Sequence, residues 1–288
     1  MTSDPPILCL RAPNPSPLTG TGTNTYLIGA TEVALVDPGP DLPEHLDAIT
    51  AALGPGQRIT HIIVTHAHLD HSALAPRIAA ATGAPVYAFG TALEGRSPLM
   101  AGLALMLPDH GEGLDLTFTP DQRLGDDDRL NGPDWTLTAL HTPGHLGGHI
   151  CLAMGETLFS GDHVMGWSTS IISPPDGDMA AYMASLDRLA QRHWRKFLAG
   201  HGAPIEDPDA RVQELIAHRR QREQEILHAL AGGPARIPQL AIGIYHQTPT
   251  HLLPAARRNV LAHLIDLSSR NQVVASPALH PDAEFYLT

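Results

Sequence analysis

A six-residue window of the chain gathers three imidazoles and one carboxylate: His66, His68, Asp70 and His71. The window directly follows residues 58–65, RITHIIVT, which we expect to form a buried strand. Imidazole nitrogen and carboxylate oxygen bind zinc and related divalent ions at about 2.0–2.2 Å. His66 and His68 can converge on one ion, and Asp70 and His71 can face a second. The alternative is a polar loop in which Asp70 caps the next helix, but it leaves the rest of the cluster unexplained.

Three later segments each end a predicted strand with a further candidate ligand: His145 in HTPGH, Asp162 in SGD and His201 in GHG. Each ligand has a glycine beside it, which lets the backbone approach an ion closely. Taken alone, His201 could be an ordinary loop histidine and Asp162 an Asx-turn residue. Together with the first cluster they complete a ligand set for two cations. Two cations about 3.5–4 Å apart lower the pKa of a shared water and give hydroxide near neutral pH.

The elements that must position these residues form a repeated strand and helix pattern. Residues 20–39 predict antiparallel strands, residues 42–53 a helix, and residues 58–83 a strand, loop and helix. A second strand-rich portion begins at residue 114 with LDLTF and ends with a strand at 196–202. The helix expected between them, residues 178–193, is capped by Asp178. Strands flanked by helices on both sides indicate a layered α/β sandwich.

The character of the chain changes after residue 208. Helices are expected at residues 209–231, 237–245 and 251–269, and a small hairpin ends the chain. We therefore expect a catalytic domain at residues 1–208 and a winged-helix-like domain at residues 209–288. The second domain either binds nucleic acid or acts as a packing or dimerisation element. If it is a dimerisation element, the protein is a homodimer.

Composition indicates a folded enzyme rather than a disordered chain, with 288 residues, 43% hydrophobic and 17% charged. The net charge of -12 is uneven: residues 1–206 hold 10 basic and 22 acidic side chains, whereas residues 207–288 hold 8 of each. An acidic body weakens nonspecific attraction to polyphosphate. Two cysteines give no disulfide framework. Without a basic leader or a membrane-length apolar run, we expect a soluble, cytoplasmic protein.

Other hydrolytic machinery is missing from the sequence. It contains no G-x-S-x-G elbow and no catalytic-cysteine signature. Among enzyme mechanisms, hydrolysis by a hydroxide that two metal ions share is the one that remains.

The order of THAHLDH, TPGH, SGD and GHG resembles the metallo-beta-lactamase superfamily. The resemblance implies a four-layer αββα sandwich that binds two divalent ions, with zinc expected and iron or manganese also suited to these ligands. Many relatives have paired glycines after the first motif, where this chain has Ser72-Ala73-Leu74. By the resemblance, one ion is bound by His66, His68 and His145, the other by Asp70, His71 and His201, and Asp162 bridges both.

Three further segments, GTNTYLIG at 22–29, VDPG at 36–39 and AHRRQREQEIL at 217–227, narrow the resemblance. They look like the beta-lactamase-like branch that includes a mitochondrial endoribonuclease and ends in a winged-helix-like domain. That branch also resembles thioesterases that release products from acyl carrier proteins, and fold does not determine substrate. Because the endoribonuclease branch and the winged-helix-like end both point to nucleic acid, the first expectation is a phosphodiester such as single-stranded RNA. The alternatives are a thioester or other acyl substrate, or a non-catalytic, metal-dependent nucleic-acid-binding module.

Some side chains near the ligands have roles that the sequence leaves open. Asp70 lies between two histidines, and we hypothesise that it handles the proton of the attacking water as well as binding metal. Residues 166–178 should line the site, so Thr169 and Ser170, together with Asn24, are candidates for substrate contact, with turn or capping hydrogen bonds as their alternative role. Four neighbouring residues stay outside the expected ligand set: Asp37, His141, His149 and His163. We interpret His149 as filling a strand position rather than orienting a ligand.

Overall fold

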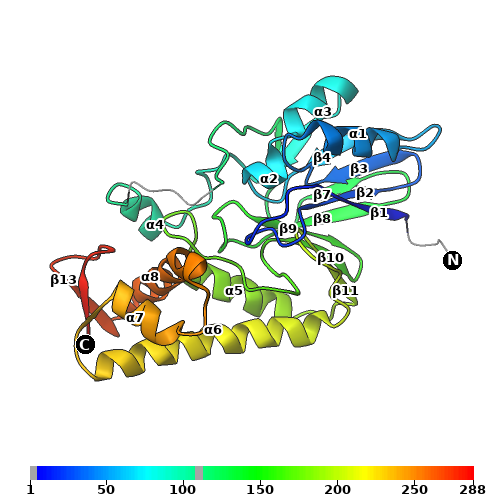
Figure 1. Cartoon of the computed structure of the whole chain (residues 1–288). Helices are drawn as coiled ribbons and strands as arrows, with labels where there is room; N and C mark the ends of the chain where they lie inside the picture. Colours follow the sequence, from blue (N-terminus) through cyan, green and yellow to red (C-terminus); the bar gives the residue numbers. More distant parts are fainter. Residues whose placement is uncertain (1–4, 108–112) are drawn as a thin grey trace.

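The first of two facing sheets has six strands in the order β1-β2-β3-β4-β5-β6. A computed structural model describes residues 5–107 and 113–288 of the chain. Strands β1 to β3 pair antiparallel and β3 to β6 pair parallel. The helices α1, Pro43–Ala51, and α3, Ala75–Thr82, cover its outer face (Figure 1). The strands are β1 Ile7–Arg11, β2 Asn24–Ile28, β3 Glu32–Val36, β4 Arg58–Ile63, β5 Val86–Ala88 and β6 Gln122–Arg123.

The second sheet has five strands in the order β11-β10-β9-β8-β7. Its outer face is covered by α5, Met179–Ala190, and by the start of α6, Pro208–Ala231. Apolar side chains of both sheets, such as Ile63 and Phe159, pack together between them. The molecule therefore has the expected four layers, helix, sheet, sheet and helix. The strands are β7 Arg129–Asn131, β8 Thr136–His141, β9 Ile150–Met154, β10 Thr157–Gly161 and β11 Lys196–Ala199.

The C-terminal part forms a compact unit against the second helical layer (Figure 1). It contains α7, Ile237–Ile244, a short 3-10 helix, Thr250–Leu252, and α8, Leu253–Ser269. A three-stranded sheet in the order β12-β14-β13 follows the pattern of a winged helix. The helix α4, Pro98–Leu103, adds apolar side chains to this core. The strands of the C-terminal sheet are β12 Ala235–Arg236, β13 Val273–Ser276 and β14 Glu284–Leu287.

Helix α6 belongs to both cores. Val212 and Leu215 near its start pack with the second helical layer, while Ile226 and Leu230 near its end pack with the C-terminal core. The expected domain boundary near residue 208 coincides with the start of this helix. The division into two domains at this residue remains our proposal. A consequence for function is that one rigid helix connects the two parts.

The expected strand at residues 114–118 is wrong. Leu114 makes one isolated bridge with His68, and the chain then turns. The Asp115 carboxylate accepts hydrogen bonds from the backbone N–H and the hydroxyl of Thr117, which is a local bond that competes with a sheet. The helix expected at the end of residues 58–83 is α3, and a further short helix, α2, Leu69–Ser72, lies in the expected loop, so that Asp70 and His71 lie inside a helical turn. No helix in the described residues is both long and apolar enough to cross a membrane.

Candidate metal centre

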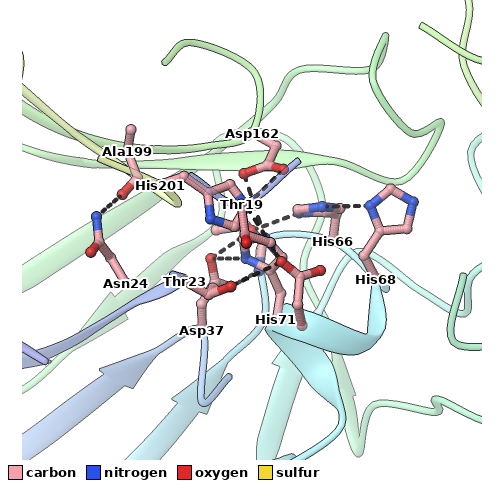
Figure 2. Close-up of polar contacts among 12 residues, drawn as sticks. Thr19, Thr23, Asn24, Asp37, His66, His68, His71, Asp162, Ala199 and His201 are labelled. Carbon is pink, nitrogen blue, oxygen red and sulfur yellow. Dashed lines mark hydrogen bonds and ion pairs between the residues drawn. The ribbon is translucent and has the colours of Figure 1, made fainter. Parts of the chain in front are cut away.

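Seven side chains from four loops converge at one edge of the sandwich. The four loops follow β4, β8, β10 and β11, whose ends meet at this edge. Figure 2 shows five of the seven pointing toward one another, with Asp162 above the histidines. Their potential ligand atoms form three groups, each with all atoms within 4.8 Å of one another. All seven expected ligands are thus brought together, in the groups His66, His68 and His145; His66, His71 and Asp162; and Asp70, His71 and His201.

The first group has the geometry of three ligands around one ion. His68 Nδ1 lies 3.0 Å from His66 Nε2 and 3.1 Å from His145 Nε2. A ring nitrogen carries one in-plane lone pair or one hydrogen, so His68 Nδ1 cannot form good hydrogen bonds with both. Two nitrogens bound at about 2.0 Å to one tetrahedral zinc are about 3.3 Å apart. The three nitrogens therefore fit a shared cation better than a chain of hydrogen bonds.

The other two groups include carboxylate oxygens. His201 Nε2 lies 3.3 Å from an oxygen of Asp70 and 3.3 Å from one of Asp162, and His71 Nε2 lies 3.4 Å from each of these carboxylates. His71 Nε2 and Asp162 Oδ1 are buried without a hydrogen-bond partner in the described residues. Buried polar atoms without partners are costly, and a cation among them would remove that cost. Oδ2 of Asp162 also lies 3.8 Å from His145 Nε2, so this carboxylate lies between the first group and the pair His71 and His201.

The outer ring nitrogens of the histidines are held by hydrogen bonds. Nδ1 of His145 lies 2.7 Å from the carbonyl oxygen of Ile171, and Nδ1 of His201 lies 3.2 Å from that of Gly22. Nδ1 of His71 lies 2.9 Å from the Asp37 carboxylate. Because each Nδ1–H donates to these oxygens, the Nε2 lone pair faces the centre. The bonds fix both the tautomer and the direction of the ligand.

Asp37 and His149 support the ligands without belonging to them. The Asp37 carboxylate accepts from His71 and from the backbone N–H and hydroxyl of Thr65, in agreement with its place outside the expected ligand set. His149 precedes β9, and its Nε2 accepts a hydrogen bond from the backbone N–H of Asp162 at 3.3 Å. It therefore does more than fill a strand position, and its spacing of four residues from His145 was the available signal. The carbonyls of Gly22 and Ile171 carry no signal in the sequence.

The three candidates for substrate contact are placed differently. Thr169 lines the cleft beside the centre. Ser170 is buried, and its hydroxyl donates to the carbonyl oxygen of Asp162. Asn24 is buried, and its amide donates to the carbonyls of Ala199 and Gly202 on either side of His201. For Ser170 and Asn24 the structure thus records internal hydrogen bonds, and neither lies among the residues that line the cleft.

The cleft beside the centre has a volume of about 490 Å³. Ligands His68, Asp70, His145, Asp162 and His201 form one wall. Much of the remaining lining is apolar and comes from both parts of the chain: Leu18, Met165, Trp167 and Ile171 from the sandwich, and Tyr245, Leu252 and Ala256 from the C-terminal part. Arg258 of α8 is the single Lys or Arg side chain among the described lining residues.

Burial and charge separate the protonation states of the ligands. Burial lowers the pKa of His66 well below its ordinary value, and burial next to His145 lowers the pKa of His68 to about 3. These two imidazoles are neutral at neutral pH and have lone pairs to offer. Burial also lowers the pKa of His71, but Asp70, Asp162 and Asp37 outweigh it and raise that pKa well above its ordinary value. Without a cation, a proton on His71 compensates the carboxylates.

Comparison with known proteins agrees with this fold and site. The model of the metallo-beta-lactamase superfamily matches residues 18–201, and that of the beta-lactamase associated winged helix domain matches residues 237–279. The "Beta-lactamase-like protein 2 homolog" of Drosophila melanogaster is 32% identical over 95% of this chain and 91% of its own. An "Atrochrysone carboxyl ACP thioesterase" of Cryptosporiopsis sp. (strain 8999) is 27% identical over 78% of this chain, which spans 63% of that relative.

Solved structures match the whole fold and the sandwich alone. A metallo-beta-lactamase family protein of Thermus thermophilus superposes with a TM-score of 0.78 and 26% identity over 98% of both chains. A protein crystallised in a di-iron-bound form has a TM-score of 0.53 and 30% identity over 71% of this chain and 98% of its own. The chain belongs to the metallo-beta-lactamase superfamily, as a hydrolase with a C-terminal winged helix domain.

Replacing Asp37 by Asn should weaken metal binding without removing a ligand. The amide cannot accept from the His71 ring as a carboxylate does, so the direction of His71 Nε2 is less well fixed. We expect metal affinity to fall about 10–100-fold, measured by competition with a chelator. Asp41→Asn, an exposed carboxylate four residues away, is the matched control and should bind as the wild type. Equal affinities for the two variants would refute the supporting role of Asp37.

Metal uptake should release protons at neutral pH. Because the pKa of His71 is raised well above its ordinary 6.5, the metal-free ring is charged at pH 7, and a cation must displace that proton. Calorimetric titration in two buffers of different ionisation enthalpy should show that binding releases protons, and affinity should rise with pH. Identical binding enthalpies in both buffers would contradict this expectation.

Proposed function

We propose that this chain is a dinuclear metal-dependent hydrolase whose substrate is a thioester or other acyl ester. The observation that carries the proposal is a complete ligand set in the wall of a largely apolar cleft. Such a cleft suits an acyl group whose carbonyl lies against the ligands.

The proposed cation sites follow the two ends of the cluster. The first cation is held by His66, His68 and His145, the second by Asp70, His71 and His201, and Asp162 contributes to both. Zinc suits these ligands and is our first choice. Iron is also compatible, and the di-iron form of a structural relative supports keeping it as a candidate.

The charge of the cleft favours an acyl substrate over RNA. Proteins that bind a phosphodiester backbone neutralise several phosphates with Lys and Arg. The described lining holds one arginine, Arg258, and the carboxylates Asp70, Asp162 and Asp176, the last of which is paired with Arg96. The thioesterase name of one relative supports the same substrate class. Single-stranded RNA, the first expectation from the sequence, gains no support from the lining.

The residues of the chain have distinct parts in the proposed reaction. When bound, two cations supply Lewis acidity and a water of lowered pKa. Asp70 lines the cleft, and its Oδ2 accepts from the Thr23 hydroxyl at 2.9 Å and lies close to His71 and His201. We assign Oδ1 of Asp70 to receive the proton of the attacking water. The apolar wall around Trp167 holds the acyl group.

A substrate panel tests this proposal. We expect metal-loaded protein to hydrolyse acyl thioesters of N-acetylcysteamine, with kcat/KM rising with acyl length because each added methylene buries apolar surface in the cleft. Labelled single-stranded RNA should not be cleaved at a comparable rate. Asp162→Asn, which loses the shared ligand, should abolish turnover in the same preparation.

Three results would overturn the acyl proposal. RNA cleavage without thioester hydrolysis would establish the ribonuclease alternative. Tight metal binding without any hydrolysis would favour the non-catalytic nucleic-acid-binding alternative. Thioester hydrolysis that persists in Asp162→Asn would show that the cluster is not the site of reaction.

Asp70→Asn tests the proton role of this residue separately from metal binding. At saturating metal, with the bound metal quantified, we expect kcat to fall by about 10²–10⁴, because an amide cannot accept the proton. Full turnover by a variant that still holds both metals would show that another group handles the proton.

A further inference from the structure

The orientation of one ligand depends on a single peptide unit far from it in the sequence. His145 lies in the loop after β8, and its Nδ1 donates to the carbonyl oxygen of Ile171 at 2.7 Å. Ile171 belongs to the loop between β10 and α5, which also lines the cleft. The direction of His145 is therefore only as well defined as this carbonyl.

The same peptide unit is held from its other side by the C-terminal part. The backbone N–H of Ile172 donates to Oδ1 of Asn259, on α8, at 3.1 Å. The C=O of Ile171 and the N–H of Ile172 form one planar trans peptide, so they point in opposite directions. Fixing the N–H thus fixes the carbonyl. The three groups form one hydrogen-bonded row from Asn259 through the peptide to His145, and such rows strengthen each member by polarisation.

Arg219 of α6 fixes both Asn259 and the preceding carbonyl. One guanidinium nitrogen donates to Oδ1 of Asn259 at 3.3 Å, and another donates to the carbonyl oxygen of Ser170. The Ser170 hydroxyl in turn donates to the carbonyl oxygen of Asp162, the shared ligand. The arginine therefore holds the loop immediately before the peptide that orients His145.

The surroundings of Arg219 indicate that it has a task other than stability. Its side chain is 1% exposed, and it lies over the Tyr182 ring at 5.2 Å from the centroid. Within residues 5–107 and 113–288 it forms no ion pair, and its Nε has no hydrogen-bond partner. Burying a cation without a carboxylate is unfavourable. A positively charged donor that fixes a loop at the metal centre accounts for its presence.

We propose that Arg219 and Asn259 are positioning residues for the first cation, which makes the C-terminal part a structural component of the metal centre. The inference rests on the proposed dinuclear centre. It also predicts an asymmetry, because the ligands that belong to the second cation alone are supported by residues of the N-terminal part. His71 is held by Asp37, His201 by the Gly22 carbonyl, and Asp70 by Thr23.

Stepwise metal affinity tests the inference in the full-length protein. Asn259→Leu and Arg219→Met should weaken one of the two cation sites about 10–100-fold, the range for residues that orient a ligand, and leave the other within about threefold. Asn259→Asp keeps an acceptor oxygen at the same place and should keep both affinities. Arg220→Met, an exposed neighbour on α6 whose side chain is 67% exposed, is the matched control for Arg219→Met.

The measurement is competition with a chromophoric chelator, combined with the visible spectrum of the cobalt-substituted protein. The spectrum should change for the weakened site alone, which a general loss of stability would not produce. If Asn259→Leu does not fold, Asn259→Ala removes the same oxygen with more space around it. Two unchanged sites in folded Asn259→Leu and Arg219→Met, or two sites lost equally, would overturn the positioning role. Wild-type protein that binds fewer than two cations would instead refute the dinuclear centre itself.

Discussion

The arrangement of this protein depends on one electrostatic constraint, which is that lone pairs aimed at the same small volume need positive charge among them. Imidazole nitrogens of His66, His68 and His145 meet at 3.0 to 3.1 Å, and the carboxylates of Asp70 and Asp162 lie close to two further imidazoles. Burial keeps water from compensating them. The two proposed cations would satisfy the cluster, and without them a proton on His71 does so in part, as its raised pKa indicates.

The rest of the molecule meets this constraint by holding His71, His145 and His201 through their outer ring nitrogens. Strand ends bring the loops to one edge, and backbone carbonyls or Asp37 accept from the outer ring nitrogens. The C-terminal part contributes in two ways, since it supplies lining residues of the cleft and contacts the loop that orients His145. Helix α6 contributes apolar side chains to both cores, so it joins the C-terminal part to the sandwich. Under the proposed function, the winged helix domain thus takes part in shaping the site of the hydrolase.

The candidate ligands could be selected from the sequence because four of them crowd one six-residue window, and because His145, Asp162 and His201 each follow a predicted strand beside a glycine. The layers were predictable because the patterns of apolar residues in segments such as β4 and α5 indicate strands and helices. The supporting contacts were not, because they join residues far apart through backbone atoms. Asn259 and Ile172 are 87 positions apart, and nothing in a helix pattern marks Asn259 as the acceptor. The strand expected at residues 114–118 failed because Asp115 bonds locally to Thr117, which alternation of apolar residues does not reveal.

Anomalous diffraction from crystals of protein loaded with metal tests the central claim most directly. We expect two peaks per chain, about 3.5–4 Å apart, one next to His68 and the other next to His201, with Asp162 between them. A single peak outside this cluster would contradict it. So would saturated crystals in which the seven side chains point to separate places and no metal lies among them.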